Sequence, residues 1–425
     1  MYGSVIGRAQ TAPARWTTLA SACLGWMFDA MDLQIFTLIL FPCVGELIGT
    51  HDPGRIAWFG GVILACKLVA WGLGGIVFGV VTDRIGRART MIITVLIFSC
   101  FTGLSGLAQN WWELAILQAL AGIGIGGEWA AGAALVAETW PERTRSRAMQ
   151  VMQMSFAFGF FLAALINLTI GPFGWRYVLF FGTVPALLTL LIRRSVAEPE
   201  RWVRARDLQA ATGGAADSAG ATFAAIFAPA FRRRTIVGVL IASTMMIGSW
   251  GASTLIPIWV NQLVGPGQRL AAIHATSTCF MLSNVGAVLG YLALIWMTDA
   301  LGRRVSYFLI VVGCAVVNVT MFTQVHSLGT LRWFMIAYGF FAVGGFGTFA
   351  VYLPELFPTR IRATGQGFCW NMARAFTAIG PFTSGALVGA FGSVASAGLT
   401  IAWIYAVGII AIWFGPETRG VPLAD

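Results

Sequence analysis

Charged side chains are scarce in this sequence of 425 residues. They make up 10% of the chain, whereas apolar residues make up 58% and the mean hydropathy is +0.79. A soluble domain carries about 25% charged residues, so a soluble fold is excluded. Apolar runs of roughly 20 residues recur along nearly the whole chain, and each can cross about 30 Å of hydrocarbon. The scarcity of charge therefore predicts an all-α polytopic membrane protein in a lipid bilayer.

Several chemical signatures are missing as well. The sequence has no Walker motif, no Gly-x-Ser-x-Gly and no His-Glu-x-x-His. Its 3 histidines are scattered, and its 7 cysteines fall mostly inside apolar runs without a Cys-x-x-Cys pair. These absences argue against an enzyme, a primary pump, a metal centre and a bound cofactor.

Lysine is nearly absent too, since Lys67 is the single lysine among 27 basic residues. With the N-terminus placed inside, 21 basic residues lie in cytoplasmic segments and 4 in outer loops. The positive-inside rule then predicts a multi-pass protein of the bacterial inner membrane with both termini cytoplasmic. The net charge of +10 is explained by topology, without nucleic-acid binding.

Twelve membrane spans are expected. They lie near 17–44, 56–81, 90–108, 112–137, 149–171, 175–192, 235–262, 270–297, 305–325, 331–354, 364–390 and 394–414. The polar stretch 193–234 separates six spans from six, which predicts an N-terminal bundle over 1–192, a cytoplasmic central loop and a C-terminal bundle over 235–425. Transporters built from two such halves bind substrate between them near the midplane.

Two charged motifs occur twice, at nearly one offset. The segment 83–87 (DRIGR) recurs at 299–303 (DALGR), 216 residues later, and the acid, proline and arginine pattern of 138–145 recurs at 355–362, 217 residues later. A shared offset predicts that the two halves are structural repeats.

These segments resemble the major facilitator superfamily. The stretch GVVTDRIGRAR (79–89) is similar to its signature between the second and third helices. The stretches 122–148, 174–202 and 353–374 resemble the branch of sialate, lactate and other carboxylate:proton symporters, and FDAMDLQIF (28–36) is similar to the Asp-x-x-Asp of first helices there and in aromatic-acid:proton symporters.

The resemblance implies two pseudo-repeats of six helices and proton-coupled symport of a small organic anion, driven by the proton gradient and carried out by a monomer. It also implies a cytoplasmic gate made by charged rim residues, namely Asp83, Arg84, Arg87, Glu138, Arg145, Asp299, Arg303, Glu355 and Arg362. In one place the sequence departs from the family, because an arginine of helix 4 that is linked to proton coupling is replaced by Gln118.

Five ionisable residues fall at mid-span: Asp29, Asp32, Lys67, Glu128 and Arg374. Each costs about 2.5–3.5 kcal/mol on insertion scales, so each is a functional candidate. Asp29 and Asp32 share one helix face at i and i+3. Carboxyl groups this close, or buried like Glu128 after two glycines, favour binding of a proton. All three acids are proton-coupling candidates, and pairing of one Asp with Lys67 is the structural alternative.

Arg374 is the strongest substrate candidate, because arginine stays cationic when buried and presents a planar fork to a carboxylate. Lys67 is a second basic candidate. Polar and aromatic residues predicted to line the binding cavity are Asn284, Tyr338, Trp370 and Asn371.

Two other functions stay open. The first is a proton-coupled carrier of a neutral or cationic solute, in which an acid binds the substrate and Arg374 is structural. The second is a sensor of the same fold that does not transport, although the residues from Gly415 to Asp425 hold no signalling domain.

Overall fold

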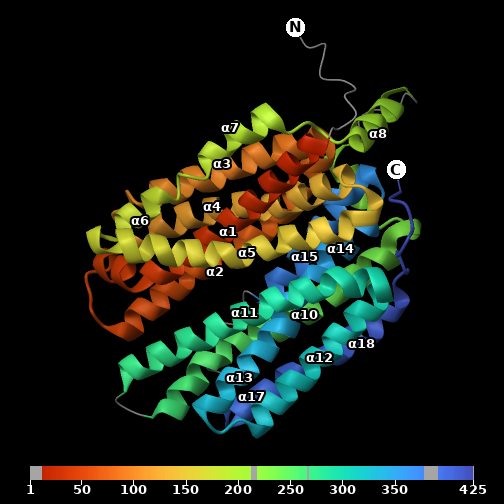
Figure 1. The fold of residues 1–425 in the computed structure, drawn as a ribbon. Coiled ribbons are helices and arrows are strands. Elements are labelled where there is room, and N and C mark those ends of the chain that lie inside the picture. The colour runs from red at the N-terminus through yellow and green to blue at the C-terminus, as the bar shows by residue number, and fades with distance from the viewer. Residues whose placement is uncertain (1–11, 212–217, 266–267, 378–390, 425) are drawn as a thin grey trace. The chain divides into compact units, whose positions relative to one another are not determined.

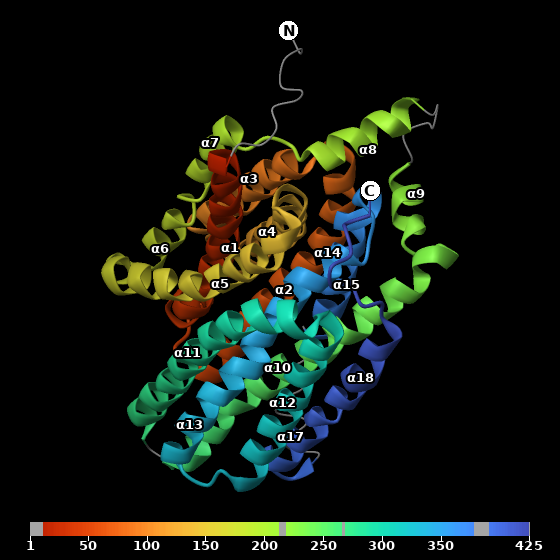
Figure 2. The same cartoon turned by 45° about the vertical axis from the view of Figure 1, so that its right-hand side comes forward.

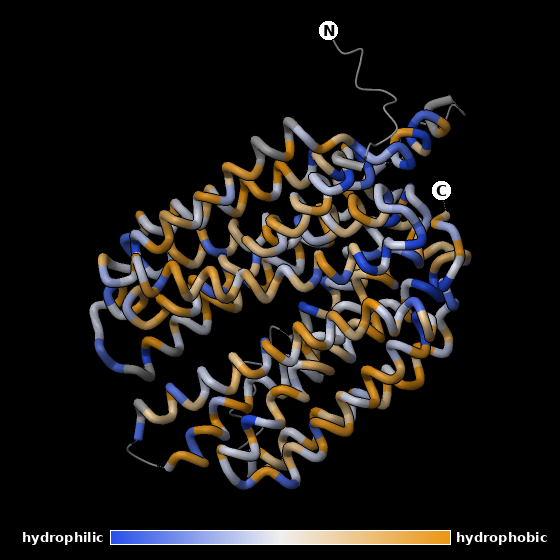
Figure 3. Tube along the Cα trace, viewed as in Figure 1, coloured by the Kyte–Doolittle hydropathy of each residue, from blue (hydrophilic) through white to orange (hydrophobic). Residues whose placement is uncertain are grey.

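The computed structural model describes residues 12–211, 218–265, 268–377 and 391–424. These ranges are helical, with no strand among them (Figure 1). Within them, ten helices, several with internal breaks, are long and apolar enough to cross a membrane. Apolar residues fill most of the helix lengths, and hydrophilic residues gather at helix ends and connections (Figure 3).

The first half begins with five long helices and continues with shorter ones. Their bounds are α1 (Ala12–Leu47), α2 (Pro53–Ile85), α3 (Arg87–Ser105), α4 (Trp111–Thr139), α5 (Glu142–Ile170), η1 (Gly171–Phe173), α6 (Trp175–Phe181), α7 (Ala186–Ser195), α8 (Glu200–Ala211) and α9 (Ala219–Ala225). The stretch predicted as a polar loop therefore contains α8 and α9 as helices of its own.

The second half repeats long helices but interrupts several. Its elements are α10 (Pro229–Val264), α11 (Arg269–Leu301), α12 (Arg303–Gln324), α13 (Leu328–Tyr338), η2 (Gly339–Val343), η3 (Gly344–Phe346), α14 (Gly347–Glu355), η4 (Thr359–Ile361), α15 (Arg362–Thr377), α17 (Val394–Ala402), α18 (Ile404–Ala411) and η5 (Ile412–Phe414).

Four predicted spans differ from single straight helices. Span 394–414 is divided into α17, α18 and η5. Span 175–192 is split into α6 and α7, with Pro185 just before α7. Span 331–354 runs from α13 to α14 through a π-turn and a 3₁₀ turn, at a glycine-rich stretch. Of span 364–390, α15 covers the part up to Thr377, and 378–390 lie outside the described residues.

The chain forms two compact units. Unit 1 comprises Met1–Arg232, Leu353–Asn371 and Gly420–Asp425, and unit 2 comprises Arg233–Tyr352 and Met372–Arg419. Unit 1 thus gathers the first six predicted spans with two short segments from late in the chain.

In unit 1, α4 is the central helix. It packs along α2 and α3, while α1 packs along α5. Glycines bring the α2 and α4 backbones together: a Cβ on Gly126 would lie 2.1 Å from the Trp71 carbonyl oxygen, and one on Gly74 would lie 2.2 Å from that of Ile123. Small residues permit this close approach in membrane helices. As a result, polar side chains of α1, α2, α3 and α4 can meet inside the unit.

Glycines also allow close helix packing in unit 2. There α11 packs on α13 and η2, and α12 packs on α17 and α18. A Cβ on Gly339 would lie 1.9 Å from the Ser283 carbonyl oxygen, so only glycine fits this approach.

Candidate functional site

Four helices of unit 1 meet at a buried ion pair. Lys67 Nζ on α2 lies 2.6 Å from Asp32 Oδ2 on α1, and both side chains are at most 1% exposed. The same nitrogen donates to Gln118 Oε1 on α4 at 2.8 Å and to the Asp32 carbonyl oxygen at 3.4 Å. Thr102 on α3 donates its hydroxyl to Asp32 Oδ1. The position at which the family carries an arginine, Gln118, thus contacts the lysine of a neighbouring helix.

A second pair of acids lies beside the first. Glu128 and Asp29 are fully buried, and their carboxyl groups adjoin one another. Glu128 packs over Gly25, since a Cβ there would lie 2.0 Å from Glu128 Oε1. Because Gly25 comes one turn before Asp29 on α1, this packing brings the acid of α4 to the acid of α1. The structure therefore divides the three predicted acids between Asp32, bound to Lys67, and the adjacent Asp29 and Glu128.

Aromatic rings surround the residue that follows Glu128. Trp129 stacks on Trp370 with ring centroids 4.5 Å apart and an interplanar angle of 14°. Its indole N–H donates to Gln153 Oε1 at 3.2 Å. Trp26 of α1 lies 6.3 Å from the Trp129 ring, centroid to centroid. This aromatic cluster joins the predicted substrate residue Trp370, on α15, to α4 and α1.

The other substrate candidates on α15 are also buried. Asn371 is fully buried against α2, where a Cβ on Gly75 would lie 1.9 Å from Asn371 Nδ2. The same amide donates to the Gly367 carbonyl at 2.9 Å. Arg374 lies one turn beyond Trp370 and is 7% exposed.

Two candidates lie in the body of unit 2. Tyr338, at the end of α13, is buried and donates its hydroxyl to the Ser249 carbonyl of α10. Asn284, on α11, is half-buried. Cavity lining by these two residues stays a prediction.

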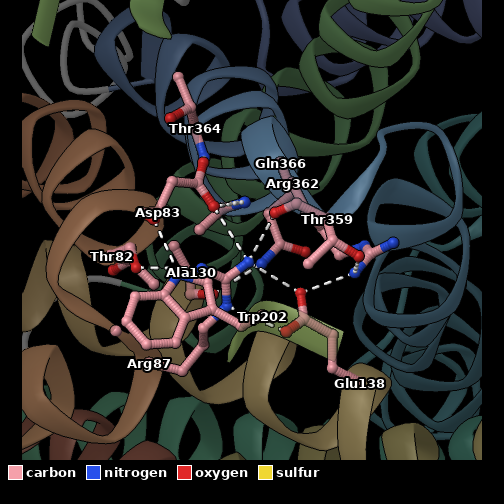
Figure 4. Close-up of polar contacts among 12 residues, drawn as sticks. Thr82, Asp83, Arg87, Ala130, Glu138, Trp202, Thr359, Arg362, Thr364 and Gln366 are labelled. Carbon is pink, nitrogen blue, oxygen red and sulfur yellow. Dashed lines mark hydrogen bonds and ion pairs between the residues drawn. The ribbon is translucent and has the colours of Figure 1, made fainter. Parts of the chain in front are cut away.

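A charge network forms the rim of unit 1 (Figure 4). Arg87 contacts Asp83 at 3.2 Å and donates two hydrogen bonds to Glu138, at 2.8 and 3.0 Å. Arg362 donates to the same carboxylate at 2.6 Å, so two guanidinium groups converge on Glu138. Arg87 also donates to the Thr359 carbonyl at 2.7 Å. Arg362, from the repeated motif 355–362 of the second half, therefore joins Arg87 and Glu138 of the first half in one network within unit 1.

Asp83 holds the start of α15. Its two carboxylate oxygens accept hydrogen bonds from the backbone N–H groups of Ala363, at 3.1 Å, and Thr364, at 2.7 Å. A carboxylate is stabilised at a helix N-terminus because the first N–H groups have no partner within the helix. Gln366 fastens the next turn by donating to the Ala130 carbonyl at 2.6 Å. These contacts dock the segment 353–371 on α2 and α4.

The remaining rim residues contribute less to the network. Arg145 lies 3.5 Å from Glu142 and 3.9 Å from Glu355. Arg84 is exposed at the end of α2.

Unit 2 repeats the rim geometry of unit 1. Arg303 lies 4.0 Å from Asp299 and donates to the Thr298 carbonyl at 3.0 Å. Arg87 makes the corresponding contact to the Thr82 carbonyl at 3.1 Å. The sequence repeat is therefore also a repeat of side-chain contacts.

Two acids that sequence analysis missed cap the third helix of each half. Glu198 accepts hydrogen bonds from the backbone N–H groups of Arg87, Ala88 and Arg89, at 2.6, 3.3 and 3.1 Å. Glu417 accepts from those of Arg303 and Arg304, each at 3.0 Å. Both acids follow the last span of their half, and this shared position was the available signal.

Trp202 was missed as well. Its indole N–H, on α8, donates to the Asp83 carbonyl at 2.8 Å. The centre of its ring lies 5.8 Å from the Arg87 guanidinium carbon. Through α8, which lies beside α4 and η4, the central segment joins the rim network (Figure 2).

Comparison with known proteins identifies the family. The sugar (and other) transporter family matches residues 55–425. The chain belongs to this family. The transporter is 30% identical over 421 residues to a probable 4-methylmuconolactone transporter of Cupriavidus pinatubonensis, covering 97% of this chain and 93% of the relative. It is 28% identical to a cis,cis-muconate transport protein of Acinetobacter baylyi, covering 86% of each chain, and 25% identical to a sialic acid transporter of Escherichia coli, covering 85% of each.

A solved structure of another protein shares the fold of the transporter. The proton:xylose symporter XylE of the major facilitator superfamily has a TM-score of 0.78, with 18% identity over 97% of this chain and 98% of that one. This likeness confirms the predicted all-α major facilitator fold. The transporter is a multi-pass membrane protein and, as predicted, not an enzyme.

Proposed function

We propose that this transporter carries a small organic anion together with protons by alternating access. The observation behind the proposal is a group of buried acids: Asp29, Asp32 and Glu128 lie at mid-span of unit 1 with Lys67. A charged side chain at this depth costs about 2.5–3.5 kcal/mol on insertion scales. Binding of a proton neutralises a carboxylate, so these acids are suited to take up and release protons. The proton gradient is then the energy source, without a further cofactor.

The anionic character of the substrate is supported by Arg374. This side chain is 7% exposed within the membrane part of α15. A guanidinium group keeps its charge when buried and forms bidentate hydrogen bonds with a carboxylate. Relatives named for cis,cis-muconate and sialic acid also favour an organic acid.

A binding panel tests the substrate class. Purified transporter is titrated with lactate, benzoate, cis,cis-muconate and sialate, while its melting temperature is recorded. Lactamide and benzamide are matched neutral controls, because each replaces only the carboxylate. We expect at least one acid to raise the melting temperature and its amide to have no effect, since a ligand stabilises the folded form that binds it. Stabilisation by neutral or cationic solutes alone would contradict an anionic substrate.

The proposed location is the bacterial inner membrane, with both termini cytoplasmic and the monomer as the working unit. The uneven distribution of basic residues, 21 against 4, supports this orientation. In a cysteine-free background, a cysteine at Gly213 or Asp425 should react only from inside and one at Asp52 only from outside. Outside labelling of the Gly213 position would contradict the topology.

A further inference from the structure

The buried acids of unit 1 differ in the partners of their carboxyl groups. Asp32 accepts from Lys67 on one oxygen and from Thr102 on the other. An ammonium group has three hydrogens, and those of Lys67 are directed to Asp32 Oδ2, to the Asp32 carbonyl and to Gln118. Gln118 is held in turn, because its amide donates to the Ser105 hydroxyl at 3.0 Å. Protonation of Asp32 would break this arrangement and leave a buried ammonium without its counter-charge.

Glu128 has a different environment. It is fully buried, and the side chain that interacts with its carboxyl group is another acid, Asp29. The acid packs on Gly25 of α1, one turn before Asp29. A buried carboxylate whose partner is an acid and not a cation is strongly disfavoured relative to its neutral form. The site therefore suits a carboxyl group that carries a proton.

The helices around Glu128 offer few other titratable groups. On α1, Cys23 and Asp29 interact with it. On α2, the Lys67 ammonium is fully engaged with Asp32 and Gln118. On α5, Gln153 accepts the indole N–H of Trp129. Finally, α15 contributes Trp370 and Cys369, with Arg374 one turn after Trp370.

We propose that the transported proton is bound by Glu128, next to Asp29, and that Asp32 stays ionised as the fixed partner of Lys67. This inference rests on the proposed proton coupling and assigns the coupling to one of its three candidate acids. On loading, a proton from water forms an O–H bond with the Glu128 carboxylate. On release, that bond breaks and the proton returns to water on the other side. Lys67 and Asp32 hold α1 and α2 together in both states.

Infrared spectroscopy of the purified transporter tests the assignment without any organic acid present. A protonated carboxyl group gives a C=O stretching band that disappears when the group ionises. We expect this band in the wild-type protein at neutral pH and its loss in alkali. Glu128→Gln should lack the band. Asp32→Asn combined with Lys67→Met removes the ion pair as a neutral set and should retain it.

Glu113→Gln is the matched control, because it makes the same change on α4 at an acid that is bonded to Gln109 and Asn110. It should retain the band. If Glu128→Gln does not fold, Glu128→Asp keeps the carboxyl group on a shorter stem and should shift the band. Four results would overturn the proposal. The first two are absence of the band in the wild type and its persistence in Glu128→Gln. The others are its loss in the Asp32→Asn, Lys67→Met double variant and an unshifted band in Glu128→Asp. Because no substrate is used, failure of proton-driven uptake would refute coupling while leaving the band in place.

Discussion

Asp32 and Lys67 compensate each other's charge inside the membrane. Without its partner each would be a buried, unpaired charge, and Thr102 and Gln118 complete their hydrogen bonds. Loss of one member of a buried pair is typically destabilising by about 3–5 kcal/mol, whereas replacement of both by neutral groups is often close to neutral. Stable folding therefore requires that both residues be present or that both be replaced, and the pair need not add net stability.

This reasoning gives a stability prediction for detergent-purified variants. Asp32→Asn leaves the Lys67 ammonium buried without its counter-charge and should lower the melting temperature strongly, in line with about 3–5 kcal/mol. Addition of Lys67→Met should restore most of the loss. A melting temperature of Asp32→Asn equal to that of wild type would show that the pair is not required.

Arg374 carries the prediction for substrate binding. Arg374→Lys keeps the charge but loses the planar fork, so it should weaken binding of the acid without unfolding the protein. Arg374→Gln removes the charge and should weaken binding by about 2–5 kcal/mol, because the bound carboxylate is left unpaired. Affinities measured beside melting temperatures separate this from a structural role. Unaltered affinity in a well-folded Arg374→Gln protein would remove the main support for an anionic substrate.

The sequence placed Asp29, Asp32 and Lys67 at mid-span but did not show which acid pairs with the lysine. Asp29 and Asp32 share one face of α1, so their spacing alone does not indicate which of them Lys67 contacts. The choice depends on Thr102 and Gln118, which are distant in sequence and reach Asp32 and Lys67 only once α3 and α4 pack beside α1 and α2. The choice of ion-pair partner therefore depends on tertiary packing, whereas the depth of each residue in the membrane could be predicted from hydropathy.

At the level of helices, distant acids cap the starts of α3 and α12. Burial raises the pKa of Glu198 in spite of three backbone hydrogen bonds from the start of α3. Burial also acts to raise the pKa of Glu417, but backbone N–H groups outweigh it and lower that pKa. The two caps thus occupy equivalent places with opposite electrostatic balance.

The opposite shifts predict opposite pH dependence. A lowered pKa in the folded state adds stability that is present above the ordinary glutamate range and is lost as pH falls through the folded value. The melting temperature of wild type minus that of Glu417→Gln should therefore increase as pH rises through the acid range. For Glu198 the folded pKa is raised, so the same difference with Glu198→Gln should decrease as pH rises. Equal trends for the two variants would contradict this account.

Helix content and the charged repeats were predictable, because hydropathy, motif spacing and basic loops are written locally in the sequence. Hydropathy did not indicate the breaks between α6 and α7 and between α13 and α14, because it does not register Pro185 or the glycine-rich stretch at which they fall. The caps were missed for a different reason: Glu198 lies more than 100 residues from the helix start that it binds.

At the scale of the whole molecule, the contacts of the segment 353–371 bear on the predicted gate. Asp83, Glu138 and Gln366 join this segment to α2 and α4 through charge-assisted and backbone hydrogen bonds. Release of such contacts is the kind of discrete change that alternating access requires. We therefore propose gating as the role of the rim charges, beside the proposed role of the mid-span acids in coupling.

Paired flux measurements in proteoliposomes test the central claim of proton-coupled anion symport most directly. The vesicles hold a pH-sensitive dye, and the radiolabelled acid is the one that binds best in the panel. We predict that an inward proton gradient drives accumulation of the acid above its outside concentration, that the lumen acidifies in step with uptake, and that a protonophore abolishes accumulation. Glu128→Gln should still exchange internal for external acid, because exchange needs no net proton release. Accumulation that ignores the proton gradient and the protonophore, or that requires sodium instead, would contradict the account.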